Sequence, residues 1–81
     1  MFITVQEIGR VGRGPTLVNT DYIEIIEPNP QSPGSTYTNI RTPHACVTVE
    51  PPPGFVLDAI AAGLRRNQEQ INLIELYHRK D

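Results

Sequence analysis

Residues 44–54, HACVTVEPPPG, mark the point at which the sequence changes from a strand pattern to a helix pattern. In the first seven of these residues, Ala45, Val47 and Val49 alternate with larger or polar residues, which is the period of a strand with one buried face. Pro51–Gly54 then ends the strand, because proline supplies no donor to a sheet ladder but is compatible with a first helical turn. The stretch therefore predicts a strand, a stiff spacer and a helix.

Extended runs also fill the chain before this stretch, and each is closed by a turn. The polar run Ser35–Arg41 reads as an edge or solvent-facing strand, or as one that pairs with another chain. Asn19–Asp21 predicts a bend inside the second run, and beyond it Ile23 and Ile25 are expected to face inward. Together the runs predict an antiparallel meander. They are Phe2–Ile8, Thr16–Glu27, Ser35–Thr42 and His44–Glu50.

The remaining third of the chain predicts one helix and an ambiguous extension. Apolar residues recur at helical spacing after Gly54 and predict a core-facing stripe. Residues 67–81 allow either a helix or a strand, with Asn67 as a helix stop. We therefore expect an α+β fold, a small four-stranded antiparallel meander that is strongly twisted and barrel-like, followed by this helix. The predicted stripe is Val56, Leu57, Ile60, Ala61 and Leu64.

Length and composition bound the organisation. The chain has 81 residues, which predicts a single domain, 1–81, with a β-meander at 1–50, a helix at 55–66 and a C-terminal extension at 67–81. A hydrophobic fraction of 38% without tryptophan makes a thin core, for which self-association is a common remedy. The net charge of −2 disfavours nucleic-acid binding.

The single cysteine and the lack of long apolar runs bear on location. Cys46 alone excludes an internal disulfide and a multi-cysteine zinc site. No apolar run approaches the ~20 residues that cross a bilayer, and the first residues lack the pattern of a signal peptide. We therefore expect a cytoplasmic protein without a membrane partner.

Six segments within residues 1–64 share an order of residues with a known family: Met1–Val5, Leu17–Ile23, Ile26–Pro28, Gly34–Ser35, Val47–Pro51 and the helical residues Val56, Leu57 and Ile60. In this order the chain resembles the FlbD/SwrD-like family of small flagellar and swarming accessory proteins, which has short phage-encoded relatives. The resemblance implies a small non-enzymatic protein that works by contacting another macromolecule.

The glycine-rich turn at residues 9–15 carries two arginines, Arg10 and Arg13. Guanidinium groups on such a loop can hold a phosphate or carboxylate through forked hydrogen bonds, although the sequence favours a flexible hairpin without a bound ligand. Tyrosines elsewhere could stack on a base, and two arginines at the helix end could add charge. The predicted ligand- or partner-binding residues are Arg10, Arg13, Tyr22, Tyr37, Arg65 and Arg66.

The sequence contains few residues that could form a catalytic or metal site. His44 and Cys46 lie two positions apart and could form a thiolate pair or part of a metal site, but only His78 remains to complete it and no acid is spaced to orient the base. The sequence favours a solvent-facing strand surface as the explanation of the two residues. We therefore predict no catalytic residues, no metal and no cofactor.

The apolar residues of the extension exceed what a finished small domain needs, so they should cover either the sheet or another subunit. The sequence thus favours a homo-oligomeric, non-enzymatic interaction protein, of phage-encoded type, that binds and modulates a host or cellular protein. The alternative is an oligomer that sequesters an anionic nucleotide or metabolite between subunits, and nucleic-acid binding is a weaker one. The predicted interface residues are Leu73, Ile74, Leu76 and Tyr77.

Overall fold

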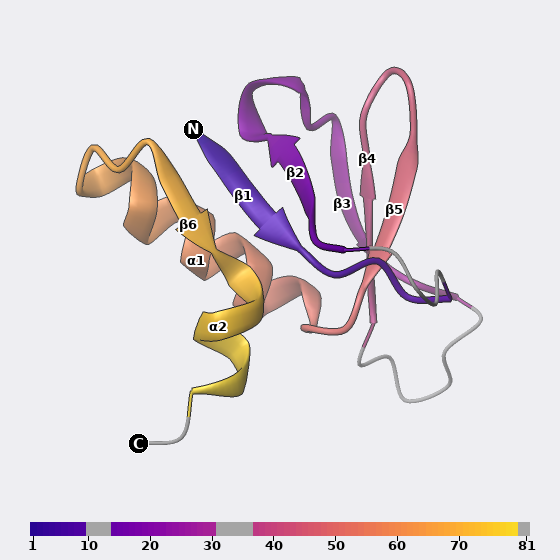
Figure 1. Ribbon diagram of the computed structural model, residues 1–81. Helices are drawn as coiled ribbons and strands as arrows, with labels where there is room; N and C mark the ends of the chain where they lie inside the picture. Colours follow the sequence, from indigo (N-terminus) through magenta and orange to yellow (C-terminus); the bar gives the residue numbers. More distant parts are fainter. Residues whose placement is uncertain (10–13, 31–36, 80–81) are drawn as a thin grey trace.

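The computed structural model describes residues 1–9, 14–30 and 37–79 (Figure 1). This part of the chain contains strands and two α-helices, which confirms the α+β class. Within it, no helix is both long enough and apolar enough to cross a membrane. The elements are β1 (Phe2–Val5), β2 (Thr16–Asn19), the 3-10 turn η1 (Thr20–Tyr22), β3 (Ile25–Pro28), β4 (Thr38–Arg41), β5 (Cys46–Val49), α1 (Pro53–Arg65), β6 (Gln70–Asn72) and α2 (Leu73–His78).

The strands form two three-stranded sheets, β2-β1-β6 and β3-β4-β5, so the predicted four-stranded barrel-like meander is wrong. The continuous meander is limited to β3, β4 and β5, because η1 turns the chain between β2 and β3. The Asp21 N–H donates to Asn19 Oδ1 at 3.0 Å, and the Ile23 N–H donates to the Thr20 carbonyl at 3.2 Å. The predicted bend at Asn19–Asp21 therefore separates two sheets instead of bending one strand.

The C-terminal extension contains both a strand and a helix. Asn67, with φ of 53°, reverses the chain after α1, in a conformation that asparagine tolerates better than most residues. β6 then pairs in parallel with β1, which places Ile71 opposite Ile3, while Val18 of β2 lies opposite Ile3 on the other side. These three side chains form a buried row across the first sheet.

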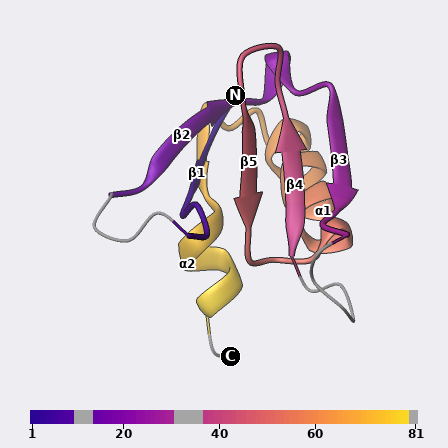
Figure 2. The same ribbon diagram turned by 90° about the vertical axis from the view of Figure 1, so that its right-hand side faces the viewer.

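The two sheets are joined through the continuation of β1. Beyond Val5 the chain meets the edge of β5, where Glu7 forms a bridge with Val49 and the Ile8 N–H donates to the Thr48 carbonyl at 2.8 Å. In Figure 2 the strands therefore follow one another as β2, β1, β5, β4 and β3, with the helices behind them.

The core lies between the strands and α1. In the second sheet Ile26, Ile40 and Val47 lie opposite one another, and Ile40 is fully buried. This register points Ile26 toward the core and leaves Ile25 46% exposed, so the predicted inward orientation of Ile25 is wrong. Ile23 packs against the core as a partly buried residue.

The predicted stripe of α1 belongs only partly to the core. Val56 is fully buried and Ile60 packs against the core, whereas Leu57 and Leu64 are 52% and 54% exposed. The helix contacts β3, β6 and α2.

β4 is the middle strand of its sheet, so the expectation of an edge or solvent-facing strand over Ser35–Arg41 is wrong for its described residues. Its polar side chains can be buried because they are hydrogen-bonded. Thr38 Oγ1 donates to the Pro51 carbonyl at 2.6 Å, and Thr48 Oγ1 donates to Asn39 Oδ1 at 2.8 Å. The first of these bonds also fixes the proline spacer against the sheet.

We expect Thr38→Val to lower the free energy of unfolding by about 1–3 kcal/mol, because it leaves the Pro51 carbonyl without its donor. Urea unfolding measures the change. Thr16→Val in β2 is the matched control, and its effect should stay within about 0.5 kcal/mol. Equal stability of the two variants would contradict a structural role for this bond.

Candidate functional site

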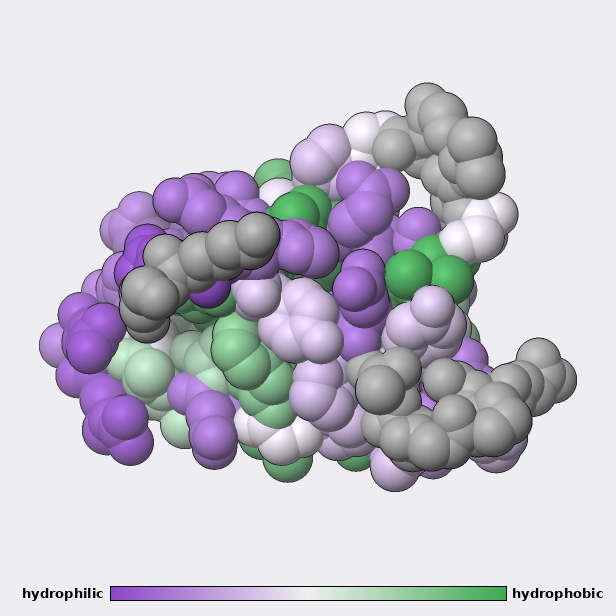
Figure 3. Space-filling view, turned by 90° about the horizontal axis from the view of Figure 1, so that it is seen from below, coloured by the Kyte–Doolittle hydropathy of each residue, from purple (hydrophilic) through white to green (hydrophobic). Residues whose placement is uncertain are grey.

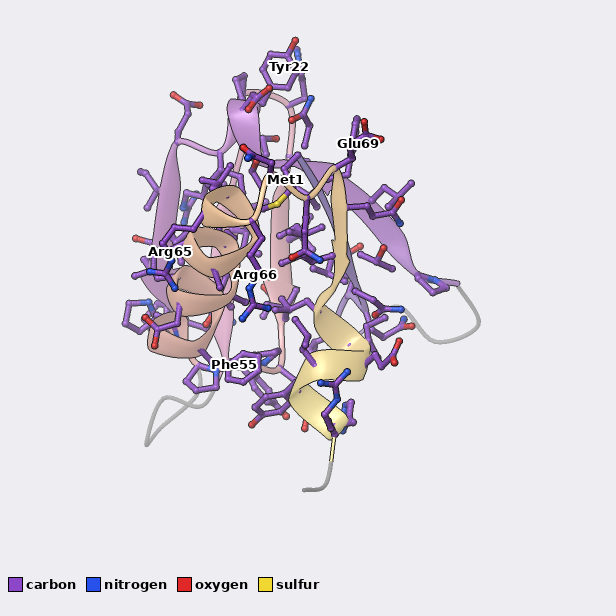
Figure 4. All side chains as sticks on the ribbon, turned by 90° about the vertical axis from the view of Figure 1, so that its left-hand side faces the viewer. Met1, Tyr22, Phe55, Arg65, Arg66 and Glu69 are labelled. Atoms are coloured by element: carbon purple, nitrogen blue, oxygen red, sulfur yellow. The ribbon has the colours of Figure 1, made fainter. Side chains whose placement is uncertain are left out.

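A groove of about 840 Å³ lies between α1 on one side and β6 and α2 on the other (Figure 4). The residues on its α1 wall recur every three or four positions, so they share one face of the helix. That wall consists of Phe55, Asp58, Ala59, Ala62, Gly63 and Arg66, and the facing wall consists of Gln68, Gln70, Ile71, Asn72, Glu75, Leu76, Tyr77 and Arg79.

Small residues in the middle of the α1 wall explain why the groove is open. At one end α1 approaches the first sheet closely, since a Cβ on Gly63 would lie 2.7 Å from Met1 Sδ and 3.2 Å from Ile71 Cγ2. At the other end Phe55 and Tyr77 pack edge to face with ring centroids 5.1 Å apart. Between these two contacts, the apolar residues of the α1 wall are the alanines Ala59 and Ala62.

Four charged side chains line the groove: Asp58, Glu75, Arg66 and Arg79. Among the described residues, none of their side chains takes part in a salt bridge or side-chain hydrogen bond. Figure 4 shows Arg66 directed into the space between α1 and the C-terminal segment, whereas Arg65 points away from it. The groove thus offers two cations and two carboxylates to a bound partner.

The predicted ligand residues are scattered over the described structure. Of Tyr22, Tyr37, Arg65 and Arg66, only Arg66 lines the groove. Tyr22 lies in η1 and is 64% exposed at the end of the molecule near Met1 (Figure 4). Tyr37 precedes β4, and its carbonyl accepts the Asn29 N–H at 3.1 Å.

The two arginines of the glycine-rich turn, Arg10 and Arg13, lie outside the described residues.

The predicted interface residues of the extension pack within the chain. Leu73 is 1% exposed and belongs to the core, and Leu76 packs against the core. Ile74 and Tyr77 are half-buried, and Tyr77 lies between the groove and a second, smaller pocket. The surfaces that stay accessible to a partner are therefore the groove on one side of α2 and the smaller pocket on the other.

Phe55 and Asp58 were not anticipated as site residues. Both belong to a series at helical spacing that ends at Arg66, and this series was visible in the sequence. Nothing in the sequence indicated that Ala59 and Ala62 of this series belong to a site, because alanine is common in helices of every kind.

The outer face of the second sheet is occupied by paired polar groups. Arg41 Nε lies 2.7 Å from Glu27 Oε1, and this hydrogen bond and the charge of Glu27 raise the pKa of the Arg41 guanidinium. Cys46 is exposed near the start of β5, whereas His78 lies in α2 beside Tyr77. In residues 1–9, 14–30 and 37–79, no three potential ligands from histidine, cysteine, aspartate or glutamate gather around one point.

No family model, curated protein or solved structure matches this chain. The case for a function therefore depends on the groove.

We expect Gly63→Leu to lower the free energy of unfolding by about 1–3 kcal/mol through overpacking, because its Cβ would lie 2.7 Å from Met1 Sδ and 3.2 Å from Ile71 Cγ2, and the rest of the leucine side chain must also find room there. Gly54→Leu, in the same helix, is the control, since nothing lies within 4 Å of a Cβ there. Chemical denaturation compares the two. A Gly63→Leu variant as stable as the control would show that α1 does not approach β6 this closely.

Proposed function

We propose that this protein is a non-enzymatic interaction module that holds a segment of another protein in the groove between α1 and the C-terminal segment, and thereby modulates that partner. The groove carries the proposal: its volume of about 840 Å³ lies near the upper end of the roughly 300–1,000 Å³ of small-molecule pockets, which leaves room for several side chains of a peptide. Its open, two-walled form suits a peptide laid between two elements. Seen from below, apolar residues lie between hydrophilic ones on the side that carries the two helices (Figure 3).

The charges of the groove favour a protein segment over a simple anion. Arg66 and Arg79 share the groove with Asp58 and Glu75, so an anion would meet two carboxylates as well as two cations. A peptide presents donors and acceptors together, and amide side chains such as Gln70 can bond to both. Electrostatic complementarity of this mixed kind favours specificity more than affinity.

The proposal extends to self-association and to the nature of the partner. Leu57 and Leu64 are exposed on α1, and Leu64 lines a shallow hollow together with Phe2, which is 45% exposed. Linked apolar side chains of this kind are typical of interaction surfaces. We propose that a second copy covers this face, and that the partner in the groove is a host or cellular protein. The resemblance to FlbD/SwrD-like accessory proteins supports this only as far as it implies contact with another macromolecule.

We expect Ala62→Gln to weaken capture of the partner by about tenfold or more, because the longer side chain occupies the groove. Capture from a bacterial lysate by tagged protein, quantified by mass spectrometry, measures this loss. Ala45→Gln is the matched control: it makes the same change at an exposed alanine that does not line the groove. A partner that both variants retain equally does not bind in the groove.

A small anionic ligand is the second candidate. It is favoured by the lack of an ion-pair partner for Arg66 and Arg79 in the described part of the chain, and by the neighbouring rings of Phe55 and Tyr77. Mononucleotides and cyclic nucleotides at fixed salt should then raise the melting temperature, since a ligand at 100 times its Kd stabilises the native state by about 2.7 kcal/mol.

Arg66→Gln should abolish this thermal shift, whereas Arg65→Gln should leave it unchanged because Arg65 points away from the groove (Figure 4). If no nucleotide shifts the melting temperature at millimolar concentration, the second candidate is removed.

A further inference from the structure

A second pocket, of about 100 Å³, lies on the other side of Tyr77 from the groove. Its floor is formed by Val5, Val49 and Leu73, each at most 1% exposed. Tyr77 lines both hollows, so a chain that lies in the groove and passes α2 can reach this pocket.

The pocket follows from the way the two sheets are joined. β1 pairs with β2 up to Val5 and with β6 up to Thr4, and its continuation meets β5 at the bridge between Glu7 and Val49 and the neighbouring hydrogen bond from the Ile8 N–H. Val5 and Val49 therefore face a common space that no continuous ladder closes. α2 covers this space with Leu73 and Ile74 but is only 6 residues long, so one side stays open.

The size of the pocket decides what it can hold. Drug-sized ligands and nucleotides occupy roughly 300–1,000 Å³, and even benzene fills a cavity of about 150 Å³. A pocket of about 100 Å³ has room for the branched end of one aliphatic side chain and is too small for a nucleotide or an indole ring. Water held against an apolar floor makes few hydrogen bonds, so an apolar group that displaces it gains affinity.

The rim of the pocket indicates the neighbouring residue of the partner. Glu50 lies exposed on the rim, and among the described residues its carboxylate has no ion-pair partner. Apart from His78, the other residues that line the pocket carry no ionisable group except the phenol of Tyr77. The electrostatic field at the mouth of the pocket therefore favours a cationic side chain.

We infer that this pocket binds one leucine-sized side chain of the partner segment, and that Glu50 pairs with a lysine or arginine next to that leucine. The inference rests on the proposed function, because it takes the segment in the groove to be a peptide. It adds the chemistry of the partner: an aliphatic anchor followed by a basic residue.

The test is an NMR titration of the isotope-labelled protein with N-acetyl-leucyl-arginine amide. The amide signals of Val5, Val49 and Leu73 should shift and saturate. N-acetyl-alanyl-arginine amide should bind about tenfold more weakly or worse, because it lacks the branched end that fills the pocket. N-acetyl-leucyl-glutamate amide should bind about two- to fivefold more weakly, as expected for an exposed ion pair. Equal binding of the leucyl and alanyl peptides to the wild type would overturn the inference without any variant.

Two variants locate the binding. Ile74→Phe narrows the pocket and should weaken the leucyl peptide, whereas Ile25→Phe, on the outer face of β3, should not. Glu50→Gln should remove the preference for arginine over glutamate and keep the preference for leucine over alanine. Unchanged binding in Ile74→Phe, or an arginine preference that survives Glu50→Gln, would contradict the assignment.

Failure of this inference is distinguishable from failure of the proposed function. If Ala62→Gln loses the partner but the leucyl peptide leaves the pocket signals unchanged, the groove binds a segment without this anchor. If the leucyl peptide binds the pocket but Ala62→Gln keeps its partner, the leucine-binding pocket is supported and the proposal that the groove holds the partner is contradicted.

Discussion

The pairing of β1 along both of its edges is the constraint on which the rest of the structure depends. β2 pairs with it in antiparallel and β6 in parallel, which buries Ile3 between Val18 and Ile71. The continuation of the same strand then bonds to β5 and so joins the second sheet. One short segment near the N-terminus thus determines where three other strands lie, and through β6 it determines where α2 begins.

The groove is a geometric consequence of that arrangement. α1 leads from the end of β5 to β6, so it must cross the inner side of both sheets. No loop separates β6 from α2, because Asn72 ends the strand and its Oδ1 caps the helix by accepting the Glu75 N–H at 3.1 Å. α2 therefore has little freedom to swing toward α1. The small residues of α1 leave the space between the helices unfilled, and the charged residues at its margins stay available.

Local structure was largely predictable from the sequence, and long-range pairing was not. The alternation before Val49, the proline spacer and the helix after it follow from local rules, and so does the turn at Asn19. The pairing of β1 with β6 does not follow from local rules, because Ile71 fits a helix pattern and a strand pattern equally well when Ile3 is not considered. The polar β4 was misjudged because hydrogen bonds to Pro51 and Thr48 satisfy its buried groups, and no periodicity reveals such bonds. Of the candidate site, Arg66 was anticipated, whereas the groove depends on tertiary placement.

The β1–β6 contact also affects the rate of folding. The Gln70 side chain donates to Thr4 Oγ1 at 3.1 Å across a separation of 66 residues, and β6 has only 3 residues with which to hold that closure. The chain must lose the conformational entropy of closing so long a loop before the burial of Ile3, Val18 and Ile71 compensates for that loss. Folding should therefore be slow for a chain of this size while the folded state is little affected, since loop entropy grows only logarithmically with length. During that delay the edge of β1 that receives β6 lacks its final neighbour, and this edge is where the unfinished chain is most exposed to pairing with another copy of itself.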